Sequence, residues 1–266
     1  MATEHLLQHF KDIPDFRINN ANYSFESFLF RDEKIIGEDF KFPSYSVLGI
    51  QAEACFKAYL QQSPYFEVLA SNLQIQGETE TLGELDYIVK NLITKENIHI
   101  ELACKFYLYD ENRSKIEEQK WIGPNQKDTL FEKLEKLKSK QFPLLYASET
   151  TKTLNEMEIE IPSKQQLCLK AFLFIPKDSN QKSFPKNYRN CIVGHYLKWE
   201  EFSEEKQAKY YLPSKKEWLL PENSIHNWQS FSEIGKQVEE QIRIKKSPLV
   251  YEKTQNNVER FFVVWW

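Results

Sequence analysis

The chain has 266 residues, a net charge of −4 and 41% hydrophobic residues, which is enough apolar material for a packed core. Only 7 residues are glycine, and neither G-x-G-x-x-G nor G-x-x-x-x-G-K-[ST] occurs, which argues against a glycine-rich phosphate loop. No apolar run reaches the ~18 residues of a membrane span, and the N-terminus lacks the pattern of a secretion signal. We therefore expect a cytoplasmic protein with no membrane partner.

The charge and the cysteines restrict the function in two further ways. A net charge of −4 gives no overall attraction to nucleic acid, so such binding would need a locally basic surface. The 4 cysteines are widely spaced and form no C-x-x-C pair, which argues against zinc ribbons and thioredoxin-like chemistry. Buried, reduced thiols are the simplest interpretation.

The first elements along the chain alternate between helical and strand patterns. Residues 1–30 indicate a short helix followed by an aromatic-rich irregular segment. Residues 44–60 indicate an amphipathic helix, with Glu53 at the edge of its apolar stripe. Residues 65–76, 83–89 and 99–106 predict three strands, and the polar run 90–97 predicts a turn between the second and third.

A second helix and a further strand are expected before residue 150. Asn125 is a candidate helix cap, with Asp128 in the first turn, followed by an apolar face that begins at Leu130. The lysines of this helix, interleaved with glutamates, favour a solvated surface, although they could also follow a phosphate backbone. Residues 142–147 predict a strand.

The second half of the chain continues the mixed pattern. Residues 167–175, 191–197 and 261–266 predict strands, and residues 199–211 and 231–245 predict helices. We expect residues 1–150 to form the core, with its N-terminal extension, and residues 151–266 to form an α+β elaboration. No Gly/Ser/Pro-rich linker separates the halves, which favours packing of both on one domain.

The central pair of strands carries the candidate chemistry. Side chains alternate along a strand, so Asp86 shares a face with Ile88 and Lys90 of its strand. By the same rule, Glu101 shares a face with Lys105. Two carboxylates from neighbouring strands can hold Mg²⁺, and a lysine beside them can stabilise charge on a phosphoryl oxygen. The same set could also be a structural ion-pair network.

Around these residues the sequence resembles the PD-(D/E)xK nuclease superfamily and, more closely, a bacterial family known as domain of unknown function 1853. The resemblance covers most of the chain and is carried by Leu48-Gly49 with Glu53, Gly83-Glu84-Leu85-Asp86, residues 101–108, Gly123-Pro124-Asn125 with Asp128, Leu130 and Lys133, and Trp218-Leu219. It implies an α/β protein with a restriction-endonuclease-like core (helix, three-strand meander, helix, strand) and a C-terminal α+β elaboration.

The resemblance also implies roles for four residues. Asp86 and Glu101 would be catalytic metal ligands, Lys105 the catalytic lysine and Glu53 an additional metal-binding acid, with Mg²⁺ or Mn²⁺ as the cofactor. The chain departs from the superfamily pattern at Ala103, where the second acid usually stands two residues before the lysine. Glu101 lies four residues before Lys105, which increases their separation on a regular strand from ~7 to ~13 Å.

Two functions follow from these observations. The first is a metal-dependent nuclease that hydrolyses phosphodiester bonds of DNA or RNA. The second is a catalytically inactive protein of the same fold that binds nucleic acid or protein, which Ala103 and the aromatic second half favour. Exposed aromatic residues could alternatively form a homodimer interface.

Overall fold

A computed structural model describes residues 3–31, 40–205, 207–255 and 257–266. Ten strands form one sheet in the described residues. Eight of them follow the order β2-β3-β4-β6-β7-β10-β9-β8, while the short strand β1 pairs with β6 and the short strand β5 pairs with β4. The strands are β1 (Glu26–Ser27), β2 (Phe66–Gln76), β3 (Thr81–Asn91), β4 (Asn97–Tyr109), β5 (Trp121–Ile122), β6 (Lys164–Pro176), β7 (Ile192–Lys198), β8 (Lys209–Tyr211), β9 (Leu249–Lys253) and β10 (Val258–Val264).

Seven α-helices accompany the sheet in the described residues. They are α1 (Thr3–Asp12), α2 (Leu48–Gln62), α3 (Glu117–Lys120), α4 (Leu130–Lys136), α5 (Ser148–Glu156), α6 (Lys186–Arg189) and α7 (Phe231–Arg243). The expected mixed α/β class is confirmed. None of the helices within the described ranges is long and apolar enough to cross a membrane.

The sheet changes from antiparallel to parallel at β4. Strands β2, β3 and β4 form an antiparallel meander, whereas β6 runs parallel to β4, β7 to β6 and β10 to β7. The turn between β3 and β4 is closed by Asn91, whose side-chain oxygen accepts hydrogen bonds from the N–H groups of Ile93 and Thr94. The element order through this region is therefore α2, three antiparallel strands, α4 and a parallel strand.

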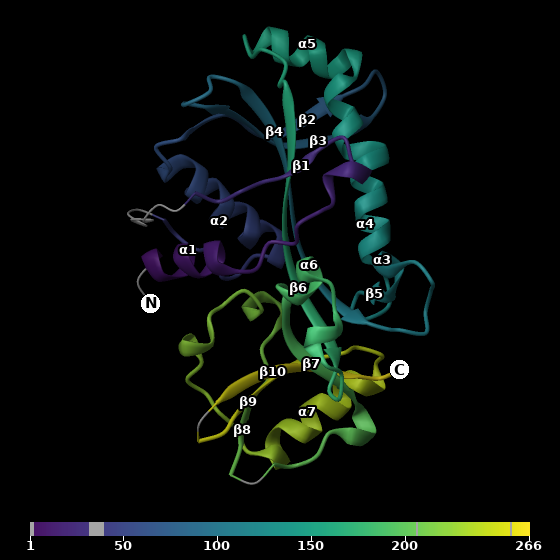
Figure 1. Cartoon of the computed structure of the whole chain (residues 1–266). Coiled ribbons are helices and arrows are strands. Elements are labelled where there is room, and N and C mark those ends of the chain that lie inside the picture. Colours follow the sequence, from purple (N-terminus) through teal and green to yellow (C-terminus); the bar gives the residue numbers. More distant parts are fainter. Residues whose placement is uncertain (1–2, 32–39, 206, 256) are drawn as a thin grey trace.

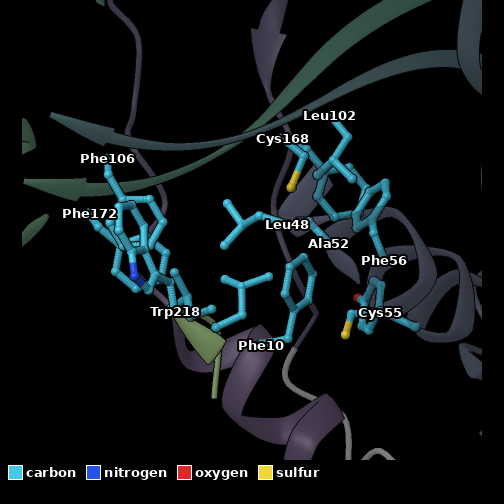
Figure 2. Packing of buried hydrophobic residues seen from close by; sticks show 14 of the residues in the cluster. Phe10, Leu48, Ala52, Cys55, Phe56, Leu102, Phe106, Cys168, Phe172 and Trp218 are labelled. Atoms are coloured by element: carbon cyan, nitrogen blue, oxygen red, sulfur yellow. The ribbon is translucent and has the colours of Figure 1, made fainter. Parts of the chain in front are cut away.

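Helices cover the two faces of the sheet around β4 and β6. In Figure 1, α1 and α2 lie on one side of the long strand β6, and α4 lies on the other. Leu48, Ala52 and Phe56 of α2 are buried toward β4 and β6, as Figure 2 shows. Beside them, Phe106 of β4 stacks on Phe172 of β6 at 4.2 Å between ring centroids. The apolar stripe predicted for α2 is thus the face that packs on the sheet.

A buried lysine fixes the N-terminal segment to β6. The Nζ atom of Lys170 donates hydrogen bonds to the carbonyl oxygens of Lys11 and Ile13, at 2.9 and 2.8 Å. It also forms an ion pair with Asp15 at 2.9 Å. The side chain of Lys170 has no exposed surface, so its charge is compensated by the end of α1 and by Asp15. The strand β1, which follows in the chain, pairs in parallel with the same strand β6.

Three predictions of secondary structure are wrong. Residues 142–147 are not a strand, because Phe142–Tyr146 forms a 3-10 helix that follows a π-helical turn at Leu137–Gln141. Pro143 lacks the N–H that a strand ladder needs, and Phe142 is instead buried against the ring of Phe25 at 3.9 Å.

The second error concerns residues 199–211, which do not form one helix in their described part. A 3-10 turn at Trp199–Glu201 is followed by strand β8, which pairs with β9. Tyr210 is fully buried, and its backbone exchanges hydrogen bonds with Gln229. A pairing partner about 20 residues downstream therefore overrides the local helical pattern.

The third error concerns the start of α4. Thr129, rather than Asn125, caps this helix through a reciprocal capping box with Glu132. The side chain of Asn125 accepts a hydrogen bond from the backbone N–H of Ser247 at 2.8 Å, far away in the sequence. The helix predicted over residues 44–60 likewise begins later, at Leu48.

Candidate functional site

The central segment of β4 lacks a strand partner on one side. Strand β3 pairs with β4 only as far as Ile100, and β5 pairs only with Leu108 and Tyr109, while β6 covers the other edge from Ile98 to Leu108. Residues 101–107 of β4 therefore border an opening between β3 and β5. This opening is where the sequence-predicted residues converge.

Asp86 occupies the point at which β3 separates from β4. Its Oδ2 atom accepts a hydrogen bond from the backbone N–H of Leu102 at 2.8 Å, in place of a strand carbonyl. The carboxyl group of Glu101 lies close to Asp86, because the charge of Glu101 raises the pKa of Asp86 and Asp86 in turn influences the pKa of Glu101. The two acids predicted from the sequence are therefore brought close together.

Burial and the proximity of the two carboxyls change their acidity. Burial, followed by the charge of Glu101, raises the pKa of the Asp86 carboxyl to about 7. Burial also raises the pKa of Glu101 to about 7, against the opposing effect of the nearby Lys133 charge. Two carboxylates close together and shielded from water repel each other when both are ionised, so near neutral pH the pair retains a proton that a cation could replace.

A polar network holds Glu101 in place from the opposite side. His99 lies with its Nε2 atom 2.9 Å from one Glu101 oxygen, and Gln141 donates to the other at 2.6 Å. Gln165 donates to Nδ1 of His99 at 3.2 Å, so the proton of the neutral imidazole is on Nε2 and faces Glu101. Burial lowers the pKa of His99 to about 4, which keeps the ring neutral.

Lys133 is the lysine whose charge acts on both acids. Its Nζ atom donates to Gln141 at 3.0 Å, so a single amide joins Lys133 to Glu101. The charge of Lys133 lowers the pKa of both Asp86 and Glu101, and their charges in turn raise its own pKa, although burial lowers it overall. The sequence alone places Lys133 on the predicted helix and among the residues of the family resemblance, but nothing local links this helix to the strands.

Lys105 is directed to a different carboxylate. Its Nζ atom lies 2.7 Å from Oδ2 of Asp128, and both side chains are about one-third exposed, at 36% and 39%. Asp128 packs against Gly123, where an added Cβ would collide with the Asp128 side chain. Gly123 also donates its N–H to the Asp128 carbonyl oxygen at 2.8 Å, so this loop positions the partner of Lys105.

Glu53 lies at the outer side of the site. Asn72 donates to Glu53 at 3.3 Å and to Glu84 at 3.2 Å, and burial raises the pKa of Glu53. The charge of Glu53 contributes to the raised pKa of Asp86, although less than Glu101 does. Glu53 is therefore near the acid pair but is bridged to Glu84 rather than to Asp86.

A cavity of about 540 Å³ lies along the unpaired segment of β4, and its lining includes the neighbours of the two acids but neither Asp86 nor Glu101. Leu102 and Lys133, which contact or influence Asp86 and Glu101, line the cavity together with Lys105 and Asp128. Its other walls come from the first turn of α2, from Pro124 and from Lys215, Lys216 and Trp218. Its volume is within the range of small-ligand sites.

The two carboxyls fit a cation that prefers oxygen ligands. No group of three or more His, Cys, Asp and Glu side chains in the described part of the chain could hold a metal ion. Mg²⁺ requires only one or two carboxylates because it retains several waters, so the donor set of Asp86 and Glu101 suits Mg²⁺ or Mn²⁺ better than zinc. Glu101 is fully buried and Asp86 is half-buried, so the side of Asp86 is the accessible one.

The fold and site define a mixed α/β protein with a buried carboxyl pair beside a lysine-lined cavity. The model of the family described as "Domain of unknown function (DUF1853)" matches residues 27–264, and the chain belongs to this family. The resemblance to domain of unknown function 1853 seen in the sequence is thereby confirmed. No curated protein and no solved structure matches the chain.

Proposed function

We propose that the protein is a divalent-metal-dependent nuclease that hydrolyses phosphodiester bonds of nucleic acid. The observation that carries this proposal is the electrostatic coupling of the Asp86 and Glu101 carboxyls, whose neighbours Leu102 and Lys133 line a cavity together with Lys105. A buried pair of acids is costly to a fold unless a proton or a cation neutralises it, and such pairs are concentrated at functional sites.

The arrangement of elements supports a PD-(D/E)xK assignment for this core. The order helix α2, meander β2-β3-β4, helix α4 and parallel strand β6 is the one that the resemblance implies. Asp86 and Glu101 lie where β3 and β4 separate, which leaves room for a ligand between the strands. Fold alone does not give function, so the proposal depends on these side chains.

Asp86 and Glu101 would hold Mg²⁺ or Mn²⁺, and Glu53 would add negative charge nearby. When bound, the cation would neutralise charge on a phosphoryl oxygen and acidify a water molecule. Gln141 and His99 keep the Glu101 carboxylate oriented, since each donates to one of its oxygens. Second-sphere donors of this kind fix the direction of a ligand's lone pairs.

The two lysines would act on the phosphate. Asp128 holds the Lys105 ammonium at the cavity wall, and Gln141 holds that of Lys133 closer to the acids. Ammonium groups fixed in this way stabilise the charge that develops on a phosphoryl group without reorganising. Lys133 would therefore share the role that the resemblance gives to Lys105 alone.

A binding module without catalysis is the second candidate, and Ala103 favours it. Ala103 is 6% exposed and lines the cavity at the usual position of the second acid, so no carboxylate projects there. In this case the lysines would bind nucleic acid or another anionic partner while the acid pair stays protonated. A cytoplasmic location and a homodimer stay predictions under either function.

Cleavage of labelled DNA and RNA, single-stranded and duplex, with Mg²⁺ or Mn²⁺ tests the proposal. The variants are Asp86→Asn, Glu101→Gln and Lys133→Met, with Asp178→Asn as a control at an exposed acid outside the site. We expect the first three to lose roughly 10²-fold or more of the activity and the control to keep it, as for other groups that stabilise a transition state. Activity that is equal in Asp86→Asn and wild type would reject the proposal, and an inactive wild type would favour the binding module.

A further inference from the structure

A second cavity adjoins the cavity along β4. It measures about 500 Å³ and shares the border residues Pro124, Lys215 and Trp218 with the first cavity of about 540 Å³. The remaining walls of the second cavity are formed by residues 212–214, by Gln241 of α7 and by residues 246–248. We call the two cavities together the lysine groove.

The lysine groove is basic although the chain is acidic. The charged residues that line it, among those the structure describes, are Lys105, Asp128, Lys133, Lys215, Lys216 and Lys246. Asp128 is the one acid in this set, and it is already paired with Lys105 at 2.7 Å. In a chain with a net charge of −4, this is the locally basic surface that nucleic-acid binding requires.

Long-range hydrogen bonds hold the walls of the groove together. Gln51 of α2 is fully buried and donates to the carbonyl oxygen of Lys216 at 2.9 Å. Asn125 accepts from the N–H of Ser247 at 2.8 Å, and the indole N–H of Trp266 donates to the Pro124 carbonyl oxygen at 3.2 Å. The groove is therefore built before any ligand arrives, which reduces the entropic cost of binding.

The size of the groove restricts the form of nucleic acid that it can take. Cavities of this volume accept units about as large as a nucleotide. A duplex, whose major groove alone is ~12 Å wide, would have to bind across an open surface instead. The rings of Phe106 and Trp218 also line the walls but are mostly buried, so the strand would be held chiefly through its phosphates by the lysines, as in other positively charged single-strand grooves.

We infer that the lysine groove binds a single strand of DNA or RNA, with its phosphates on Lys215, Lys216 and Lys246 and its path leading to Asp86 and Glu101. The inference rests on the proposed function for the choice of a phosphodiester as ligand. It goes further in assigning strandedness and in giving a role to residues 212–218 and 246–248, which lie far from the carboxyl pair in the sequence. Binding along the groove does not require the acid pair to hold a cation.

The test measures binding in EDTA, so that no cleavage occurs. Fluorescence anisotropy follows a labelled single-stranded oligonucleotide, as DNA and as RNA, and the matching duplex, with the full-length protein. The double variant Lys215→Glu/Lys246→Glu removes two proposed phosphate contacts. Lys152→Glu/Lys186→Glu is the matched control, since these lysines are exposed and lie outside the groove.

We expect the wild type to prefer the single strand by about tenfold or more. The groove variant should lose about tenfold in affinity and reduce the magnitude of the salt slope by about 1.4, which is about 0.7 for each lost phosphate contact. The control variant should bind as the wild type does. Circular dichroism of both variants checks that they are folded.

Three results would overturn the inference: equal affinity for single strand and duplex, equal loss in the control variant, or equally tight binding of polyglutamate, which would assign the groove to an acidic protein partner. Failure of the proposed function is a separate result. Intact single-strand binding in EDTA without cleavage in Mg²⁺ or Mn²⁺ would reject the nuclease and support the groove.

Discussion

The carboxylate of Asp86 takes the place of a strand partner for Leu102, accepting its backbone N–H at 2.8 Å where β3 and β4 separate. An unpaired N–H at this position would be partly buried and would cost ~1–3 kcal/mol. Asp86 therefore has a structural role in addition to its proposed role toward a cation. The two roles can be separated by substitution.

Both Asp86→Asn and Asp86→Ala should lose cation binding, but the two variants should differ in stability. The Asn side chain keeps an oxygen for the Leu102 N–H and removes the repulsion with Glu101, so its free energy of unfolding at neutral pH should equal or exceed that of wild type. Asp86→Ala should be less stable than Asp86→Asn by ~1–3 kcal/mol, because it leaves the N–H unpaired. Urea unfolding measures both, and equal stability of the two variants would contradict the structural role.

The stability of the protein should depend on pH through the acid pair. The folded-state pKa values of Asp86 and Glu101 are raised to about 7, whereas unfolded carboxyls titrate near ~4. The folded protein then binds more protons than the unfolded chain between these values, so the pair's contribution to the free energy of unfolding falls as pH rises through this window. Comparison with Asp86→Asn cancels the titration of other groups.

We therefore expect the stability of wild type relative to Asp86→Asn to decrease from about pH 5 to about pH 8. A divalent cation replaces the proton of the pair, so Mn²⁺ should raise the melting temperature of wild type more at the higher pH. Thermal unfolding at both pH values, with and without Mn²⁺, measures this. A difference between wild type and variant that does not change with pH would contradict the coupling of the two carboxyls.

Gly123→Ala should disturb the pair of Asp128 and Lys105. A Cβ at Gly123 would collide with the Asp128 side chain, so we expect a loss of ~1–3 kcal/mol in the free energy of unfolding, typical of overpacking. Gly49→Ala is the control at the same cavity, because no atom lies within 4 Å of the added Cβ. Gly49 lies in the first turn of α2, where helix propensity counts less than in the interior, so this control should be neutral or stabilise by less than ~1 kcal/mol. Equal effects of the two substitutions would contradict the described packing.

The sequence was sufficient to predict the strands whose burial pattern is local. β2, β3, β4, β6 and β7 were expected near their observed positions, because each is a run of apolar residues bounded by polar turns. Phe142 and Tyr210 misled the prediction because their partners, Phe25 and Gln229, are distant in the sequence. Tertiary contacts of this kind override the local preference of a short segment.

The proximity of the two acids and the place of Lys105 on β4 were predictable from the sequence, but the positions of the other lysines were not. Asp86 and Glu101 stand on neighbouring strands, so alternation of side chains was enough to place them near each other. Lys133 reaches the acids through Gln141, and Lys215 and Lys246 reach the groove from segments more than 100 residues after β4. Only the packing of α4 and of the C-terminal half on the sheet brings these charges together.

Titration calorimetry of Mn²⁺ into wild type and Asp86→Asn at about pH 8 tests the central claim most directly, since the pair is then ionised. The account predicts binding at one site in the wild type, released protons when the titration is repeated near neutral pH, and no binding in Asp86→Asn. Absence of binding to the folded wild type, or equal binding to both proteins, would contradict the assignment of Asp86 and Glu101 as a cation site.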